Sequence, residues 1–111
     1  MNQEYLVGEL SARLEQLQRE ADQPAAGDVA RLRNQVETGP LAVLPSATVR
    51  ALALADGLCW DSLSRGDTGA FARQAAIAAD LRLFGICAGL LEGTGSFPPE
   101  PQDYRCWHKQ L

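Results

Sequence analysis

The chain is poor in the residues on which most enzyme chemistry depends. Its 111 residues include a single histidine, His108, and aromatic residues make up only 6% of the composition. No serine or cysteine stands in a nucleophile motif beside that histidine, and the sequence has no phosphate-binding glycine loop and no metal-hydrolase motif. A carboxylate pair such as Asp56 and Asp61 is too common to indicate acid–base catalysis. We therefore expect that this chain is not an enzyme by itself and carries no cofactor.

The sequence also lacks a basic cluster. Lysine and arginine total 10 against 14 aspartate and glutamate residues, the net charge is −4, and the isoelectric point is about 4.8. A local basic excess occurs only at Arg105, His108 and Lys109. Surfaces that bind nucleic acid usually carry a continuous basic patch. We therefore expect no nucleic-acid partner.

Cysteine is scarce and irregularly spaced. Cys59, Cys87 and Cys106, together with His108, form a valid Cys₃His zinc set by residue type. No Cys-x₂-Cys pair is present, however, and Cys59 and Cys87 lie in apolar segments, where a buried cysteine behaves as a small hydrophobe. We therefore expect no bound metal. An odd number of cysteines without paired spacing indicates reduced thiols, and no N-terminal apolar run resembles a signal peptide, so we expect a cytoplasmic protein.

What the sequence does have is a long apolar stretch from Val49 to Leu91, interrupted once by a turn at residues 65–69. We interpret it as two helices, over residues 47–65 and 68–92, with Gly66 ending the first and Asp67 or Thr68 capping the second. The second helix is apolar around more than half of its circumference, so something must cover it. The cover is either the rest of the chain or a second copy. The longest uncharged run is too short and too rich in alanine and glycine to indicate a membrane span, so we expect no membrane partner.

Two further helices precede this hairpin, over residues 3–22 and 28–38. Asp28 is the expected N-cap of the second. The first has apolar residues at spacings of three and four, which form one stripe: Val7, Leu10, Leu14, Leu17 and Ala21. The stripe packs either inside the bundle or against a second copy. If a second copy covers it, Leu10→Asp with Leu14→Asp separates the copies and leaves a helical monomer.

The predicted fold is therefore all-α. Residues 1–92 form a compact four-helix bundle on a central αα-hairpin, with loops short enough for antiparallel neighbours. Residues 93–111 form an extended, proline-rich C-terminal tail, because prolines favour polyproline geometry. The tail carries Tyr104 and Trp107, which either strap back over the bundle or bind another chain.

Two places in the hairpin are candidate sites. Gly85 and Gly89 form a small-residue groove that lets another helix approach closely, either within the bundle or in a homodimer. Asp56 falls on an apolar stripe, where a carboxylate needs a partner, and either Arg82 on the facing helix or Arg50 on the same helix can supply one. With Trp60 and Arg82 it forms either an ion-pair site or a small ligand pocket.

These patterns favour a non-catalytic protein-interaction module, such as a small adaptor, regulator or chaperone-like subunit. The expected partner is a second copy of the chain, another protein, or both. The interface candidates are Val7, Leu10, Leu14, Leu17, Gly85, Gly89, Tyr104 and Trp107. Two alternatives remain open: a small-ligand-binding regulator that uses Asp56, Trp60 and Arg82, and an accessory subunit of an enzyme.

Overall fold

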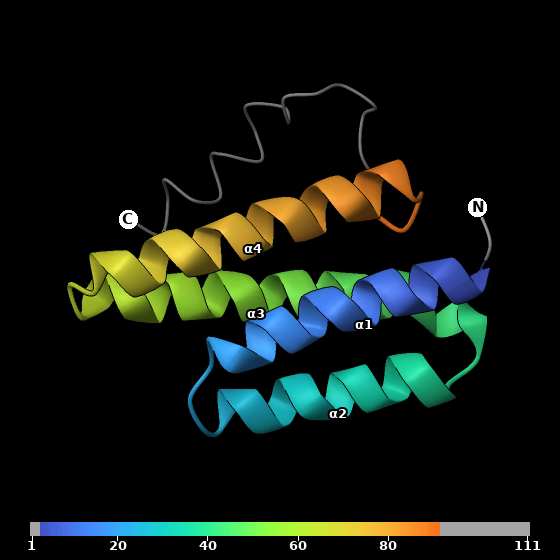
Figure 1. Cartoon of the computed structure of the whole chain (residues 1–111), viewed down its shortest axis with the longest axis horizontal. Coiled ribbons are helices and arrows are strands. Elements are labelled where there is room, and N and C mark those ends of the chain that lie inside the picture. The colour runs from blue at the N-terminus through green and yellow to red at the C-terminus, as the bar shows by residue number, and fades with distance from the viewer. Residues whose placement is uncertain (1–2, 92–111) are drawn as a thin grey trace.

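The computed structural model describes residues 3–91 of the chain, and this part consists of helices and short connections (Figure 1). The elements are α1 (Gln3–Arg19), α2 (Ala25–Thr38), the 3₁₀ turn η1 (Leu41–Val43), α3 (Leu44–Ser64) and α4 (Thr68–Cys87). No strand occurs among the described residues. The predicted all-α fold, a compact four-helix bundle, is confirmed. The predicted tail over residues 93–111 lies outside the described residues.

The four helices form two antiparallel hairpins, α1–α2 and α3–α4, which pack on each other. α3 contacts α2, and both helices of the second hairpin contact α1. In Figure 1, α4 and α2 lie at opposite edges of the molecule, with α3 and α1 between them. The Cα atoms extend 39 × 34 × 18 Å, so the bundle is a thin slab. A helix at the edge of such a slab has fewer neighbours than one in the middle.

The core lies where the two hairpins meet. Leu10, Leu14 and Leu17 of α1 are completely buried there, against apolar residues of the other helices. Burial of each leucine side chain contributes roughly 2 kcal/mol. The apolar stripe of the first helix therefore packs inside the bundle, and its three leucines are not available as a seam for a second copy. Val7 is half-buried and packs against the same core.

In the first three helices, three starts and ends differ from the sequence-based bounds by about one turn. α2 begins at Ala25, so Asp28 lies in its first turn and pairs with Arg31 instead of capping the helix. α3 begins at Leu44, one turn earlier than expected, with Pro45 in its first turn, where a missing N–H costs nothing. α1 ends at Arg19 rather than near residue 22. Caps that satisfy free N–H groups are favourable but optional, which explains why the cap-based start of α2 was wrong.

Two glycines end the helices of the second hairpin in the same way. Gly66 and Gly89 both have φ of +74°, a left-handed conformation that glycine adopts without a steric penalty. After α4, the N–H of Leu90 donates to the carbonyl of Gly85 at 2.8 Å, and the N–H of Gly89 donates to that of Ile86 at 3.1 Å. These paired bonds are a Schellman motif, and they end α4 at Cys87 rather than near residue 92. Gly66 was correctly predicted as the end of the third helix.

Candidate interaction surface

α4 is apolar on nearly all sides, but its neighbours cover only part of it. Ala78, Leu81 and Gly85 are buried on the side that faces α3. At 100° per residue, Phe84 and Asp80 fall on one flank of that side. This flank meets α1, because the Arg13 guanidinium stacks 4.4 Å from the centre of the Phe84 ring and its Nε forms a 2.8 Å ion pair with Asp80 Oδ2. The opposite flank of α4 therefore points away from the first hairpin.

That opposite flank is apolar and largely uncovered. It carries Ala72, Ala75, Ala76, Ala79, Leu83 and Ile86, and Leu83 is 42% exposed. The adjoining flank of α3 carries Val49, Leu52, Trp60 and Leu63, and Val49 is 55% exposed. We call these ten residues, together with Asp56 and Arg82, the open face. Asp56 and Arg82 place the two flanks on the same side of the hairpin, because their side chains interact electrostatically.

Asp56 is the polar side chain least satisfied in this face. Its Oδ1 atom is buried and accepts no hydrogen bond within the described residues. Burial raises the pKa of its carboxyl above the ordinary value of 3.8, and the charge of Arg82 opposes this shift only in part. Trp60 is half-buried one turn away. The structure thus brings Asp56 and Arg82 into electrostatic contact, as the sequence suggested, without a direct ion pair between them.

We expect Asp56→Asn to stabilise the dilute protein at pH 7 and to leave its stability unchanged near pH 3. The folded state holds the Asp56 proton more tightly than the unfolded state, because burial raises the pKa. Stability therefore falls as the pH rises above the unfolded value of 3.8, and this loss disappears when the carboxyl is replaced. Urea denaturation at pH 3 to 7 measures the difference. Asp61→Asn, at an exposed position of the same helix, is the control, and equal effects of the two variants at pH 7 would contradict the prediction.

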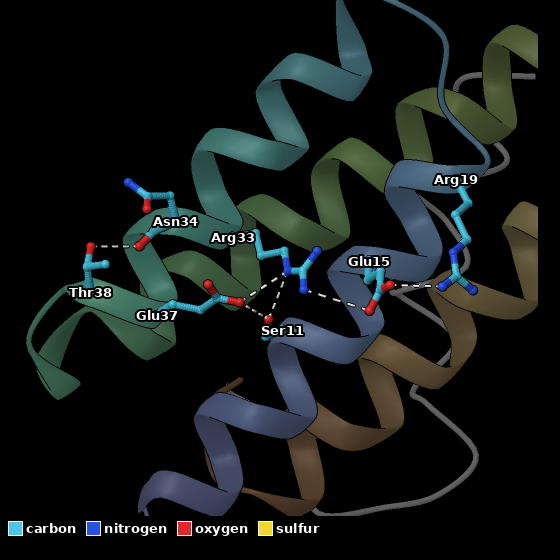
Figure 2. A network of polar contacts seen from close by, with 7 residues as sticks. All are labelled: Ser11, Glu15, Arg19, Arg33, Asn34, Glu37 and Thr38. Carbon is cyan, nitrogen blue, oxygen red and sulfur yellow. Dashed lines mark hydrogen bonds and ion pairs between the residues drawn. The ribbon is translucent and has the colours of Figure 1, made fainter.

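A second polar cluster joins α1 to α2, away from the open face (Figure 2). Ser11 donates to the Glu37 carboxylate at 2.5 Å, and Arg33 Nε donates to Ser11 at 3.0 Å and to Glu37 at 3.1 Å. The Ser11 hydroxyl, with help from Arg33, lowers the pKa of Glu37. These contacts join the two helices of the first hairpin, so the cluster holds α1 against α2.

A groove of about 370 Å³ lies between α2 and α3. It is lined by Asp28, Arg31, Leu32, Gln35, Arg50, Ala53 and Leu54. Asp56, Trp60 and Arg82 do not line it. A ligand pocket at those three residues stays a prediction.

Of the cysteine, histidine and tail candidates, the structure describes Cys59 and Cys87. Cys59 is buried, and burial together with the negative charge of Asp56 raises its pKa to about 11, whereas Cys87 is exposed. Among residues 3–91, no three histidine, cysteine or acidic side chains cluster as metal ligands would. Cys106, His108, Tyr104 and Trp107 lie outside the described residues.

The two glycines of the predicted groove do not form one. Gly85 is buried, and a Cβ atom built on it would lie 2.5 Å from Leu91 Cδ1 and 3.0 Å from Thr48 Cγ2. Its missing side chain therefore makes room inside the chain, and the space is already filled. Gly89 lies beyond the end of α4, because its positive φ breaks the helix. Both glycines are thus corrected from interface candidates to internal packing and helix termination.

Three residues of the open face, Asp56, Trp60 and Arg82, were sequence-based candidates, but the exposed apolar flank of α4 was not. α4 has apolar residues in all directions, so its sequence does not say which side is buried and which is left open. Only the contacts with α1 and α3 distinguish the two sides.

Comparison with protein-family models, with curated proteins and with solved structures finds no significant match to this chain. Within residues 3–91, one segment, Leu41–Ser64, is long and apolar enough to cross a membrane, with a mean hydropathy of 1.4 in its most apolar window. A single such helix is weak evidence, since core helices of soluble proteins share this property. The surface described above is therefore the main guide to function.

Proposed function

We propose that this chain is a non-catalytic protein-interaction module whose contact surface is the open face of the α3–α4 hairpin. The observation that carries the proposal is the exposed apolar flank of α4, which continues onto α3. Large apolar patches exposed on a small domain commonly mark contact with another macromolecule. Removal of apolar surface from water contributes roughly 25 cal/mol per Å², so a partner that covers this face gains stability from burial alone.

The composition of the open face also suits a protein partner. Its alanines have small side chains, which allow a second helical element to pack at close range, and its larger apolar side chains come from both α3 and α4. Interface cores are depleted in charge, and this face holds two charged residues, Asp56 and Arg82, of opposite sign. A partner with an apolar helical surface therefore matches it in both shape and charge.

Affinity capture with the full-length tagged chain tests this proposal. We expect wild-type chain to retain one or more proteins, untagged copies of itself included, that Leu83→Glu fails to retain. Leu83 is an exposed position on α4, so a glutamate there places a charge on the open face without disturbing the core. Gln16→Glu is the matched control, because it adds the same charge at an exposed position of α1. Retention of the same proteins by wild type and Leu83→Glu would refute the proposal.

A further inference from the structure

We propose that the partner on the open face is a second copy of this chain, related by a two-fold axis that brings Asp56 of each copy against Arg82 of the other. This inference rests on the proposed interaction function and names the partner. A two-fold contact uses the same patch on both copies, so the patch has to be complementary to itself. The open face meets this condition, since its two charges have opposite signs and lie within an otherwise apolar surface.

The register of the hairpin allows the two pairs to form together. At one end of the hairpin Thr48 lies beside Gly85, and at the other Ser62 donates to Gln74, so α3 and α4 run antiparallel. By this register, Asp56 and Arg82 lie within about one helical turn of the same level. A two-fold axis parallel to the helices places α3 of one copy over α4 of the other at equal levels. Asp56 then faces the partner's Arg82, and Arg82 faces the partner's Asp56.

The unsatisfied carboxylate of the single chain favours this arrangement. Asp56 Oδ1 accepts no hydrogen bond within the described part of the chain, and the charge of Arg82 offsets the effect of burial on the pKa of this carboxyl only in part. An arginine has five N–H donors in a planar fork that matches a carboxylate. Across the interface, each Asp56 carboxylate gains a donor that the described part of its own chain does not supply. A purely apolar or singly charged partner would instead bury one of these groups unpaired, which is costly.

The size of the face is also adequate for self-association. α4 has 20 residues and α3 has 21. Helices of this length are about 30 Å long and about 10 Å wide, so the hairpin presents a face of roughly 600 Å² in projection. Specific protein interfaces bury about 800 Å² of accessible surface on each partner. Because side chains make the accessible surface of a face larger than its projected area, the hairpin face approaches this value. The two hairpins together would form a second four-helix bundle, with the α1–α2 hairpins on the outside.

Mixing two charge-reversal variants tests whether the pairs cross between copies. Asp56→Arg has two positive charges in its open face, and Arg82→Asp has two negative charges, so each variant repels itself. We expect each alone to be a folded monomer with self-association weakened at least about tenfold. We expect an equimolar mixture to form a one-to-one heterodimer, because each cross-pair is then of opposite sign. Native mass spectrometry distinguishes the heterodimer from the two possible homodimers by mass. Circular dichroism confirms that each variant is folded.

The other outcomes overturn the inference in different ways. Self-association of both variants at wild-type strength would show that Asp56 and Arg82 do not meet at the interface. A wild-type chain that stays monomeric at high concentration would exclude the second copy. If such a monomer still loses a captured protein through Leu83→Glu, the proposed interaction function stands and only the identity of the partner fails. If Tyr104→Ser with Trp107→Ser makes a monomeric chain associate, the chain's own C-terminal residues are the occupant.

Discussion

Replacement of Leu14 by alanine is expected to lower the free energy of unfolding by about 3 kcal/mol. Leu14 has no exposed surface, and it lies where the two hairpins meet. Its truncation removes apolar contacts and leaves a cavity that the surrounding helices cannot fully close. A domain of this size has a total stability of the order of 5–10 kcal/mol, so the loss is a large fraction of it. Urea denaturation followed by circular dichroism gives the value directly.

Leu83→Ala is the matched control, because Leu83 is also a helical leucine but lies on the open face with 42% of its surface exposed. We expect it to cost less than about 1 kcal/mol in the monomer, since surface truncations away from special features have small effects. Similar losses for Leu14→Ala and Leu83→Ala would contradict the assignment of core and surface.

A larger substitution in the core follows the same reasoning. Leu10→Asp with Leu14→Asp, which the sequence suggested would only separate a dimer, is now expected to unfold the chain, because two carboxylates would be buried without partners.

Much of the fold could be predicted from the sequence because its signals are local. Gly66 and Asp67 mark the turn of the second hairpin, and the Asp67 carboxylate accepts the N–H of Ala70 at 3.0 Å, as an N-cap does. The three-and-four spacing of α1 correctly indicated a buried stripe. The spacing could not predict what this stripe packs against, because the same pattern occurs inside bundles and between two chains. The structure decides for the bundle, since Leu10 and Leu17 are fully buried within one chain.

The surface available to partners was harder to predict, for a physical reason. A helix with one apolar stripe shows its buried side in its sequence, but α4 has apolar residues all round. The side that is buried depends on long-range polar contacts that fix its rotation. Arg13 of α1 reaches Asp80 and the ring of Phe84 on one flank, and Gln74 holds the start of α4. Each partner in these contacts is more than fifty residues away along the chain, beyond the reach of periodicity.

Gln74→Ala tests the second of these anchors, and we expect it to cost about 2–3 kcal/mol. Gln74 is only 3% exposed. Its amide oxygen accepts a hydrogen bond of 2.6 Å from the hydroxyl of Ser62 in α3. Its amide nitrogen donates a hydrogen bond of 3.2 Å to the backbone carbonyl of Glu20, just beyond the end of α1. Truncation leaves a small cavity and removes a donor and an acceptor from buried or half-buried groups, each of which carries a desolvation cost. Urea denaturation measures the loss, with Gln16→Ala at an exposed position of α1 as the control.

A double-mutant cycle with Ser62→Ala separates the hydrogen bond from the cavity. Because Ser62 donates to Gln74, we expect Ser62→Ala with Gln74→Ala to be less destabilising than the sum of the two single changes. Additive losses would mean that Gln74 acts through packing alone.

The same variants also test how the rotation of α4 affects association through the open face. Glu20 is also bound by Arg73 of α4, whose Nε lies 2.7 Å from its carboxylate, so loss of Gln74 leaves α4 with one remaining link to the end of α1. If the rotation of α4 determines which apolar flank is exposed, Gln74→Ala weakens association through the open face, whereas Gln16→Ala leaves it unchanged.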